Sequence, residues 1–152
     1  MSRDLDHFNW LAHYYDSLTG IVFGKALHKS QVCFLRLVPQ GCNMLIIGGG
    51  SGKILTVLQE VNPSCNIWYV EASSEMLSMA AKKISGEFRS RLSFIHGTEK
   101  SIPQGIRFDV VMTNFFLDLY PDQQLLEITE KIYHSLDRKG LWLVSDFVDG
   151  GK

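Results

Sequence analysis

The fold is decided by the stretch Met44-Leu45-Ile46-Ile47-Gly48-Gly49-Gly50-Ser51-Gly52. Four apolar residues lead directly into a loop that holds four glycines, and apolar residues at helical spacing follow. Glycines at such a junction allow positive φ and let a ligand approach the main chain. A loop that leads into a helix N-terminus also presents free N–H groups to polar or anionic ligand groups. The stretch therefore predicts a strand, a ligand-binding turn and a helix.

Four further short apolar runs follow this loop: Asn66–Val70, Leu92–Ile95, Phe108–Thr113 and Gly140–Asp146. Most are nearly continuous rather than alternating, which indicates strands that are buried on both faces, as in a parallel sheet covered by helices. Segments with apolar residues at helical spacing lie between the runs, and the last of them stops near Gly140. The alternation predicts an α/β fold with right-handed crossovers.

Composition limits the classes of protein to consider. The 152 residues predict one domain, 1–152, in which 1–40 form a helical cap and 41–147 a cofactor-binding core. A net charge of -1 argues against binding to nucleic acid, and no apolar run is long enough to span a membrane. The start of the chain has no apolar secretory segment. Three unclustered cysteines suggest reduced thiols, buried as small apolar residues, in a cytoplasmic protein. They are Cys33, Cys42 and Cys65.

The glycine loop does not fit two common phosphate-binding patterns. A Walker A loop would need glycine at Ile47 and a hydroxyl residue at Ile54, and a dinucleotide fingerprint would need glycine at Lys53. The loop reads instead as G-x-G-x-G, and Glu71 stands at the end of the next predicted strand. A carboxylate at this place can accept both ribose hydroxyls of a nucleoside. Together, the loop and Glu71 predict a nucleoside site.

Five segments in this order resemble the class I S-adenosylmethionine-dependent methyltransferases, and within them the small-molecule group of the ubiquinone/menaquinone-biosynthesis type. They cover roughly residues 8 to 147. The resemblance implies a Rossmann-like three-layer sandwich with N-terminal helices and a parallel five-stranded sheet in the order 3-2-1-4-5. The segments are Tyr14–Asp16 with Phe23-Gly24, Met44–Gly52, Val70–Leu77, Phe94–Glu99 with Ile102-Pro103, and Phe108–Asp118.

The same resemblance implies S-adenosylmethionine as the cofactor and assigns the residues that hold it. In the family, the glycine loop approaches the methionine end, the acid after the second strand holds the ribose, the third-strand region borders adenine, and the fourth strand ends beside the transferred methyl group. The residues that this assigns to cofactor binding are Tyr15, Gly48, Gly49, Gly50, Gly52, Glu71, Ala72, Met76, Gly97, Thr98, Glu99, Asn114 and Phe115.

Two positions depart from the family pattern. The family usually has an acid two residues before the first glycine, where this chain has Ile46, and often an Asp after the third-strand glycine, where it has Thr98. Either Thr98 or Glu99 is therefore expected to reach the adenine ring. Asp118 is the candidate catalytic residue, since a carboxylate there can orient a substrate hydroxyl or act as a base. The scattered histidines and cysteines predict no metal site.

The function implied is methyl transfer to a small-molecule acceptor. Positioning provides most of the catalysis in such a reaction, because the sulfonium is already a good electrophile. One alternative is a non-catalytic cofactor-binding or interaction module with the same fold, to which Ile46 and Thr98 point. Another is an NAD-dependent oxidoreductase, which Lys53 disfavours. The methyl acceptor cannot be read from the sequence.

The last predicted strand raises a question about partners. The resembled family has two more strands after it, and the chain ends shortly beyond Asp146. The run Leu141 to Val144 would then be an exposed apolar edge, which proteins normally avoid. We therefore expect a C-terminally truncated domain, or a homo-oligomer that pairs through this edge.

Overall fold

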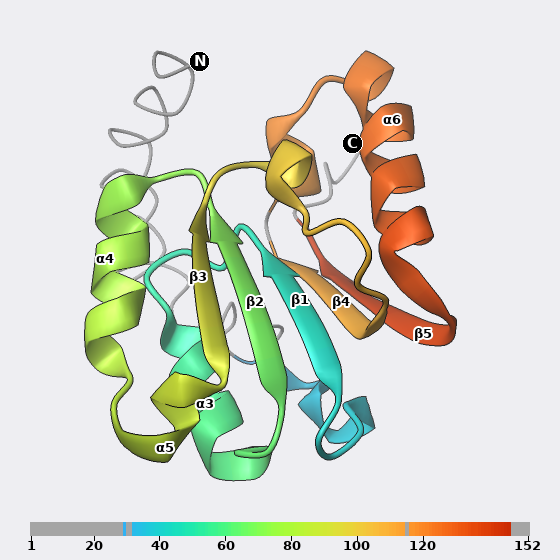
Figure 1. Cartoon of the computed structure of the whole chain (residues 1–152). Helices are drawn as coiled ribbons and strands as arrows, with labels where there is room; N and C mark the ends of the chain where they lie inside the picture. Colours follow the sequence, from blue (N-terminus) through green and yellow to red (C-terminus); the bar gives the residue numbers. More distant parts are fainter. Residues whose placement is uncertain (1–28, 30–31, 115, 147–152) are drawn as a thin grey trace.

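The chain folds around one parallel sheet of five strands (Figure 1). The computed structural model describes residues 29, 32–114 and 116–146. In these residues the strand order is β3-β2-β1-β4-β5 and every neighbouring pair is parallel, as predicted. The strands are β1 (Asn43–Ile47), β2 (Asn66–Glu71), β3 (Leu92–His96), β4 (Phe108–Asn114) and β5 (Leu136–Ser145).

Helices cover both faces of the sheet. Figure 1 shows α3 and α4 on one side and α6 on the other. Short 3-10 turns precede β1 and follow β3 and β4. The helical elements are η2 (Leu35–Leu37), α3 (Lys53–Val61), α4 (Ser74–Lys83), α5 (Gly86–Ser90), η3 (Glu99–Ser101), η4 (Leu117–Leu119) and α6 (Asp122–Ser135).

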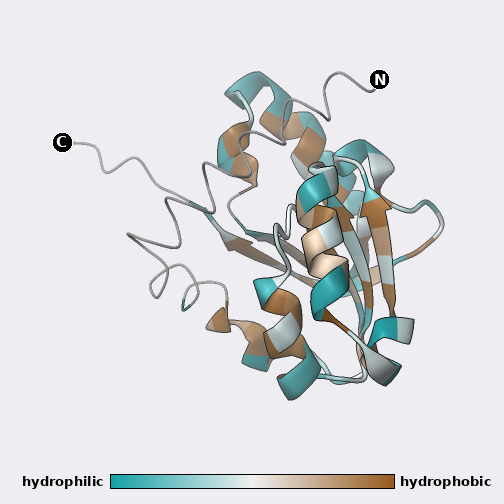
Figure 2. Ribbon diagram, turned by 90° about the vertical axis from the view of Figure 1, so that its left-hand side faces the viewer, coloured by the Kyte–Doolittle hydropathy of each residue, from teal (hydrophilic) through white to brown (hydrophobic). Residues whose placement is uncertain are grey.

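The side chains of strand β1 pack into a hydrophobic core on each face of the sheet. Met44 and Ile46 point into a core that also contains α3 and α4 residues, whereas Leu45 and Ile47 point into a second core that contains α6 residues. All four are fully buried. In Figure 2 the strands are largely hydrophobic, and the helices carry both hydrophobic and hydrophilic residues. This three-layer arrangement confirms the Rossmann-like prediction.

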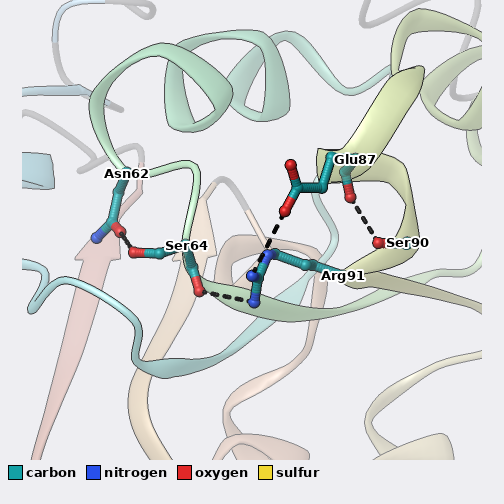
Figure 3. A network of polar contacts seen from close by, with 5 residues as sticks. All are labelled: Asn62, Ser64, Glu87, Ser90 and Arg91. Carbon is teal, nitrogen blue, oxygen red and sulfur yellow. Dashed lines mark hydrogen bonds and ion pairs between the residues drawn. The ribbon is translucent and has the colours of Figure 1, made fainter.

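Polar groups at the amino end of the sheet, where the strands begin, bond mainly to one another. The Asn62 amide nitrogen donates to the carbonyl oxygen of Pro39 at 2.9 Å, and its side-chain oxygen accepts from the Ser64 hydroxyl at 3.3 Å. Figure 3 shows that Arg91 donates in turn to the Ser64 carbonyl oxygen and faces Glu87. These contacts fix the loops that lead into β1, β2 and β3.

Two element boundaries differ from the predictions. The predicted helix that runs to Gly140 ends at Ser135, and β5 begins immediately at Leu136. The Arg107 guanidinium donates to the carbonyl oxygens of His134 and Leu136. It thus provides hydrogen-bond donors for carbonyl oxygens that the end of α6 leaves without partners, where the chain turns into the sheet. The short helix α5 was also not predicted, because a five-residue helix has too few positions to show a period.

Two of the three cysteines are buried as predicted. These are Cys42 and Cys65, but Cys33 is exposed because it precedes η2 and lies outside the packed layers. Most of the predicted cap over 1–40 lies outside the described residues. No helix in the described ranges is long and apolar enough to cross a membrane.

Candidate functional site

The glycine loop joins β1 to α3 at the carboxyl end of the sheet, where the strands finish. Gly48, Gly50 and Gly52 have φ values of 69°, 68° and 87°, a region that other residues rarely adopt. Gly52 is also the N-cap of α3, which has no side-chain cap. A Cβ at Gly52 would lie 2.7 Å from Ala80 Cα, so glycine also allows α3 and α4 to pack closely.

Tyr69 supports the loop from below. The phenol is fully buried, and its hydroxyl donates to the Gly50 carbonyl oxygen at 2.8 Å. A Cβ at Gly49 would lie only 2.3 Å from the Tyr69 ring, so the second glycine is required by the tyrosine beneath it. Burial raises the pKa of Tyr69 well above its ordinary value, which keeps the hydroxyl protonated as a donor.

Glu71 ends β2 directly beside this loop. One carboxylate oxygen accepts from the Gly50 N–H at 2.9 Å and the other from the Ser73 N–H at 2.9 Å. Only 8% of the residue is exposed, and this burial raises the pKa of the carboxyl group. The two N–H donors act in the opposite direction, because they favour the charged form. The hydrogen bond from Gly50 therefore holds both the loop and the Glu71 carboxylate, which is the group predicted to bind ribose.

The segment after β3 brings a second carboxylate to the same end of the sheet. The Gly97 N–H donates to the Glu71 carbonyl oxygen at 3.0 Å, which aligns the ends of β2 and β3. Thr98 is the N-cap of η3, and its hydroxyl oxygen accepts from the Lys100 N–H at 3.4 Å. The buried carboxylate of Glu99 accepts from the Tyr120 hydroxyl at 3.1 Å.

Tyr120 is hydrogen-bonded to Glu99 and lies close enough to Glu71 to be affected by its charge. Burial raises the pKa of its hydroxyl, and the charges of Glu99 and Glu71 raise it further. Its ring also packs edge-on against Phe116, with centroids 5.1 Å apart. The tyrosine thus joins the β3 side of the site to the segment that follows β4.

The end of β4 closes the site beside the glycine loop. Asn114 is buried at the last position of the strand. The Phe116 ring lies so near Gly48 that a Cβ there would be 3.0 Å from it, and the Phe116 N–H donates to the Asp146 carboxylate at 3.0 Å. Burial and the nearby Asp118 raise the pKa of Asp146 to about 6. Asp118 is exposed, and partial burial of its carboxyl group raises its pKa as well.

The remaining predicted residues occupy the start of α4 or fall outside the described chain. The Ala72 carbonyl oxygen is bonded to the His96 ring at 2.9 Å. Met76 is buried on α4, where its N–H donates to the Ser73 hydroxyl oxygen that caps the helix. Tyr15 and Phe115 lie outside the described residues.

Three residues of the site were not predicted from the sequence: Tyr69, Tyr120 and Asp146. Parallel pairing could have indicated the first, because Tyr69 pairs with Ile46, two residues before the loop. Asp146 follows β5 directly, and ligands in such sheets bind outside the carboxyl ends of the strands. No local signal indicates Tyr120, because its contact with Glu99 depends on how η4 is placed.

Comparison with known families decides the classification. Residues 44–140 match the sequence pattern of the methyltransferase domain, which is more than half of the chain. The chain belongs to the methyltransferase domain family. No curated protein matches it. The matched residues run from β1 into β5, so the family pattern contains the glycine loop, Glu71 and the segment after β3.

Solved structures with similar folds agree with this family assignment. A structure described as a DhpI complex with SAM and HEP superposes with a TM-score of 0.75 at 17% identity, and covers 97% of this chain and 65% of its own. A DhpI complex with SAH gives a TM-score of 0.76 at 18% identity over 95% of this chain and 68% of that one. The methyltransferase domain described here thus spans about two thirds of the length of these proteins.

A third structure is a putative S-adenosylmethionine-dependent methyltransferase from Methanococcus maripaludis. Its TM-score is 0.67 at 19% identity, and the match covers 88% of this chain and 61% of that one. At this level of identity the likeness shows the fold. Family and fold therefore confirm the predicted resemblance, whereas the ubiquinone/menaquinone-type subgroup stays a prediction. The described residues of this methyltransferase domain contain no group of three or more metal-ligating side chains.

Proposed function

We propose that this domain binds S-adenosylmethionine at the carboxyl end of the sheet and transfers its methyl group to a small-molecule acceptor. The observation that carries the proposal is Glu71, a buried carboxylate that shares its hydrogen bonds with the glycine loop. Structures with similar folds are complexes with SAM or SAH, as for DhpI, or with SAM, as for the glycopeptide N-methyltransferase MtfA.

The carboxylate of Glu71 has the capacity that a ribose requires. Each of its oxygens accepts one main-chain N–H, at 2.9 Å in both cases. A carboxylate has about four lone-pair sites, so each oxygen can accept a further bond from a ribose hydroxyl. Such charge-assisted bonds are about twice as strong as neutral ones.

The other parts of the cofactor find matching groups nearby. Glu99 is the better candidate for the adenine amino group, because its carboxylate is buried and held by Tyr120, whereas the Thr98 hydroxyl oxygen already caps η3. The uncapped start of α3 suits the carboxylate of the methionine part. Asn114 and the loop glycines 48, 49, 50 and 52 would surround the rest, with Ala72, Met76 and Gly97 at the nucleoside end.

The bound cofactor supplies an activated methyl group on a positively charged sulfur. This chain's contribution is to hold that group in line with the acceptor atom, which is the main source of rate in a positioned reaction. Acceptors that must lose a proton need a base as well. Asp118 and Asp146 follow β4 and β5 at this end of the sheet, and the Asp146 pKa of about 6 suits proton transfer near neutrality.

Several broader assignments belong to the same proposal. We assign residues 41–147, with Phe115 among the cofactor-binding residues, to the cofactor-binding core, and 1–40 with Tyr15 to a cap. We also propose a cytoplasmic protein that does not bind nucleic acid. Strand β5 forms one edge of the described sheet, and the 39% and 41% exposure of Leu141 and Val144 supports pairing with a second copy through it.

Calorimetric titration separates this function from its alternatives. We expect S-adenosylmethionine to bind with one-to-one stoichiometry, and NAD at the same concentrations to give no heat of binding. Saturable binding of NAD without binding of S-adenosylmethionine would support the oxidoreductase alternative. No binding of S-adenosylmethionine at millimolar concentration would overturn the proposal. If it binds but transfers no methyl group to any of a panel of acceptors, the non-catalytic module is favoured.

A further inference from the structure

Cys42 and Cys65 form a buried pair at the amino end of the sheet, opposite the proposed cofactor site. Their sulfur atoms lie 3.1 Å apart although the residues are separated by 22 others in the sequence. Cys42 is 5% exposed and Cys65 is fully buried. The proposed methyl transfer uses neither residue.

The backbone around the pair is already arranged for a disulfide. Cys42 and Cys65 directly precede Asn43 and Asn66, which are partners in the parallel pairing of β1 and β2. Adjacent strands lie about 4.8 Å apart, and disulfides form between Cα atoms about 4.4–6.8 Å apart. The sulfurs need to approach by only about 1 Å, because a disulfide bond is about 2.05 Å long.

The loops that carry the two cysteines are held in place. The Asn66 N–H donates to the Cys42 carbonyl oxygen at 2.9 Å, and the Cys65 N–H donates to the Asn62 carbonyl oxygen at 3.3 Å. Asn62 and Ser64 belong to the polar network of Figure 3. Rotation of the side chains can therefore bring the sulfurs together without a movement of the strands.

The two thiols are not equivalent. The hydrogen bond from Cys42 lowers the pKa of Cys65, and main-chain N–H groups of Cys42 and Gly41 act in the same direction. Burial and the Asp109 carboxylate, which accepts from the Asn43 N–H at 2.8 Å, oppose this effect. Since Cys65 is the favoured thiolate and thiolates are the reactive form, Cys65 is the expected attacking sulfur.

We propose that Cys42 and Cys65 are a redox-active dithiol that hydrogen peroxide oxidises to a reversible disulfide. The Cys65 thiolate attacks one peroxide oxygen, the O–O bond breaks, and the departing hydroxide is protonated to water, which leaves Cys65 as a sulfenic acid. Cys42 then loses its proton and attacks the Cys65 sulfur, the S–O bond breaks, and a second water leaves. Two thiols give up two electrons and two protons, and one peroxide becomes two waters.

The disulfide would join the residues that directly precede β1 and β2. These strands carry the glycine loop and Glu71 at their other ends, so the bond fixes the amino ends of the two strands without touching the cofactor groups. A cross-link across a loop of this length restricts the unfolded chain. The expected rise in the melting temperature is roughly 5–10 °C.

The test uses the full chain with Cys33→Ser, which removes the exposed thiol and prevents cross-links between molecules. After treatment of the folded protein with hydrogen peroxide, we expect an intact mass lower by two hydrogens, a non-reduced peptide that joins positions 42 and 65, and the higher melting temperature. Dithiothreitol should reverse all three. The matched control, Cys33→Ser with Cys42→Ser, keeps the attacking sulfur without its partner, so it should gain oxygen instead and should not become more stable.

Two results would overturn the proposal. One is a folded Cys33→Ser protein that keeps the dithiol mass under peroxide, or whose cysteines gain oxygen rather than joining. The other is a disulfide that forms only in denaturant, since that would show that the native pair is inert. Binding of S-adenosylmethionine is measured separately, so failure of the dithiol and failure of the proposed function can be distinguished.

Discussion

The carboxyl and amino ends of the sheet are built from the same strands, yet their polar groups have different partners. At the amino end, the Asn62 side chain bonds to Pro39 and Ser64, and Arg91 bonds to the Ser64 carbonyl oxygen. At the carboxyl end, Glu71 bonds to two main-chain N–H groups and keeps further acceptor capacity. The difference separates groups that stabilise the fold from groups that can also bind a ligand.

The hydroxyl group of Tyr69 is one of two side-chain groups that hold the glycine loop at the carboxyl end. The family usually has an acid at the position of Ile46, but in this chain Ile46 is fully buried in the core. The loop is anchored instead by the Tyr69 hydroxyl and the Glu71 carboxylate, which bond to the carbonyl oxygen and the N–H of Gly50. The loop therefore has its own supports without an acid at position 46.

The largest expected effect is at Glu71. Glu71→Ala removes the proposed ribose acceptor and leaves the Gly50 and Ser73 N–H groups without their partner. We expect affinity for S-adenosylmethionine to fall about 100-fold, because two charge-assisted bonds together contribute about 3 kcal/mol. Calorimetry measures the change. The control is Glu87→Ala at the amino end, whose side chain is 89% exposed, and it should bind as the wild type does. Equal affinities for both variants would refute the ribose assignment.

Gly49→Ala should have the next largest effect. Its Cβ would lie 2.3 Å from the Tyr69 ring, so the loop or the ring must move. We expect the free energy of unfolding to fall by roughly 1–3 kcal/mol, with weaker cofactor binding. Denaturant titration provides the measurement. Gly50→Ala is the matched control, because a Cβ there meets nothing within 4 Å and the cost of about 1 kcal/mol comes from its positive φ alone. A smaller loss for Gly49→Ala than for the control would contradict the supporting role of Tyr69.

Asn62→Ala tests the amino end. Asn62 is 1% exposed, and its side-chain amide nitrogen donates to the carbonyl oxygens of Val38 and Pro39. The variant leaves both oxygens without this donor. We expect the free energy of unfolding to fall by about 1–2 kcal/mol while affinity for S-adenosylmethionine stays unchanged. Denaturation and calorimetry on the same preparation give both quantities. A marked loss of affinity at unchanged stability would show that the two ends are not separate.

The smallest effect concerns Asp146 and pH. Its pKa of about 6 in the folded chain lies above the ordinary value of about 3.9, so the folded state holds the proton more tightly. The stability that this proton contributes is complete below about pH 4 and is lost as the pH rises through about 6. Asp146→Asn should remove this part of the pH dependence, which amounts to under about 1 kcal/mol after solvent screening, since the residue is only partly buried. Identical pH profiles for variant and wild type would contradict the raised pKa.

Sequence reasoning succeeded where the signal is local. The continuous apolar runs predicted the strands, and the loop from Gly48 to Gly52 with Glu71 predicted which ends of β1 and β2 meet. It failed where a contact joins distant segments, as between Tyr120 and Glu99, or between Asp146 and the Phe116 N–H. The same limit applies to Cys42 and Cys65, which are unclustered in the sequence but adjacent in the sheet.

The most direct test of the division between the two ends is a map of backbone amide shifts on titration with S-adenosylmethionine. We expect the largest changes at Gly50, Ser73 and Gly97, whose N–H groups bond to Glu71. The amides of Asn62 and Ser64 at the amino end should keep their positions. Saturable shifts centred on the amino end, with Gly50 and Ser73 unmoved, would contradict the placement of the cofactor.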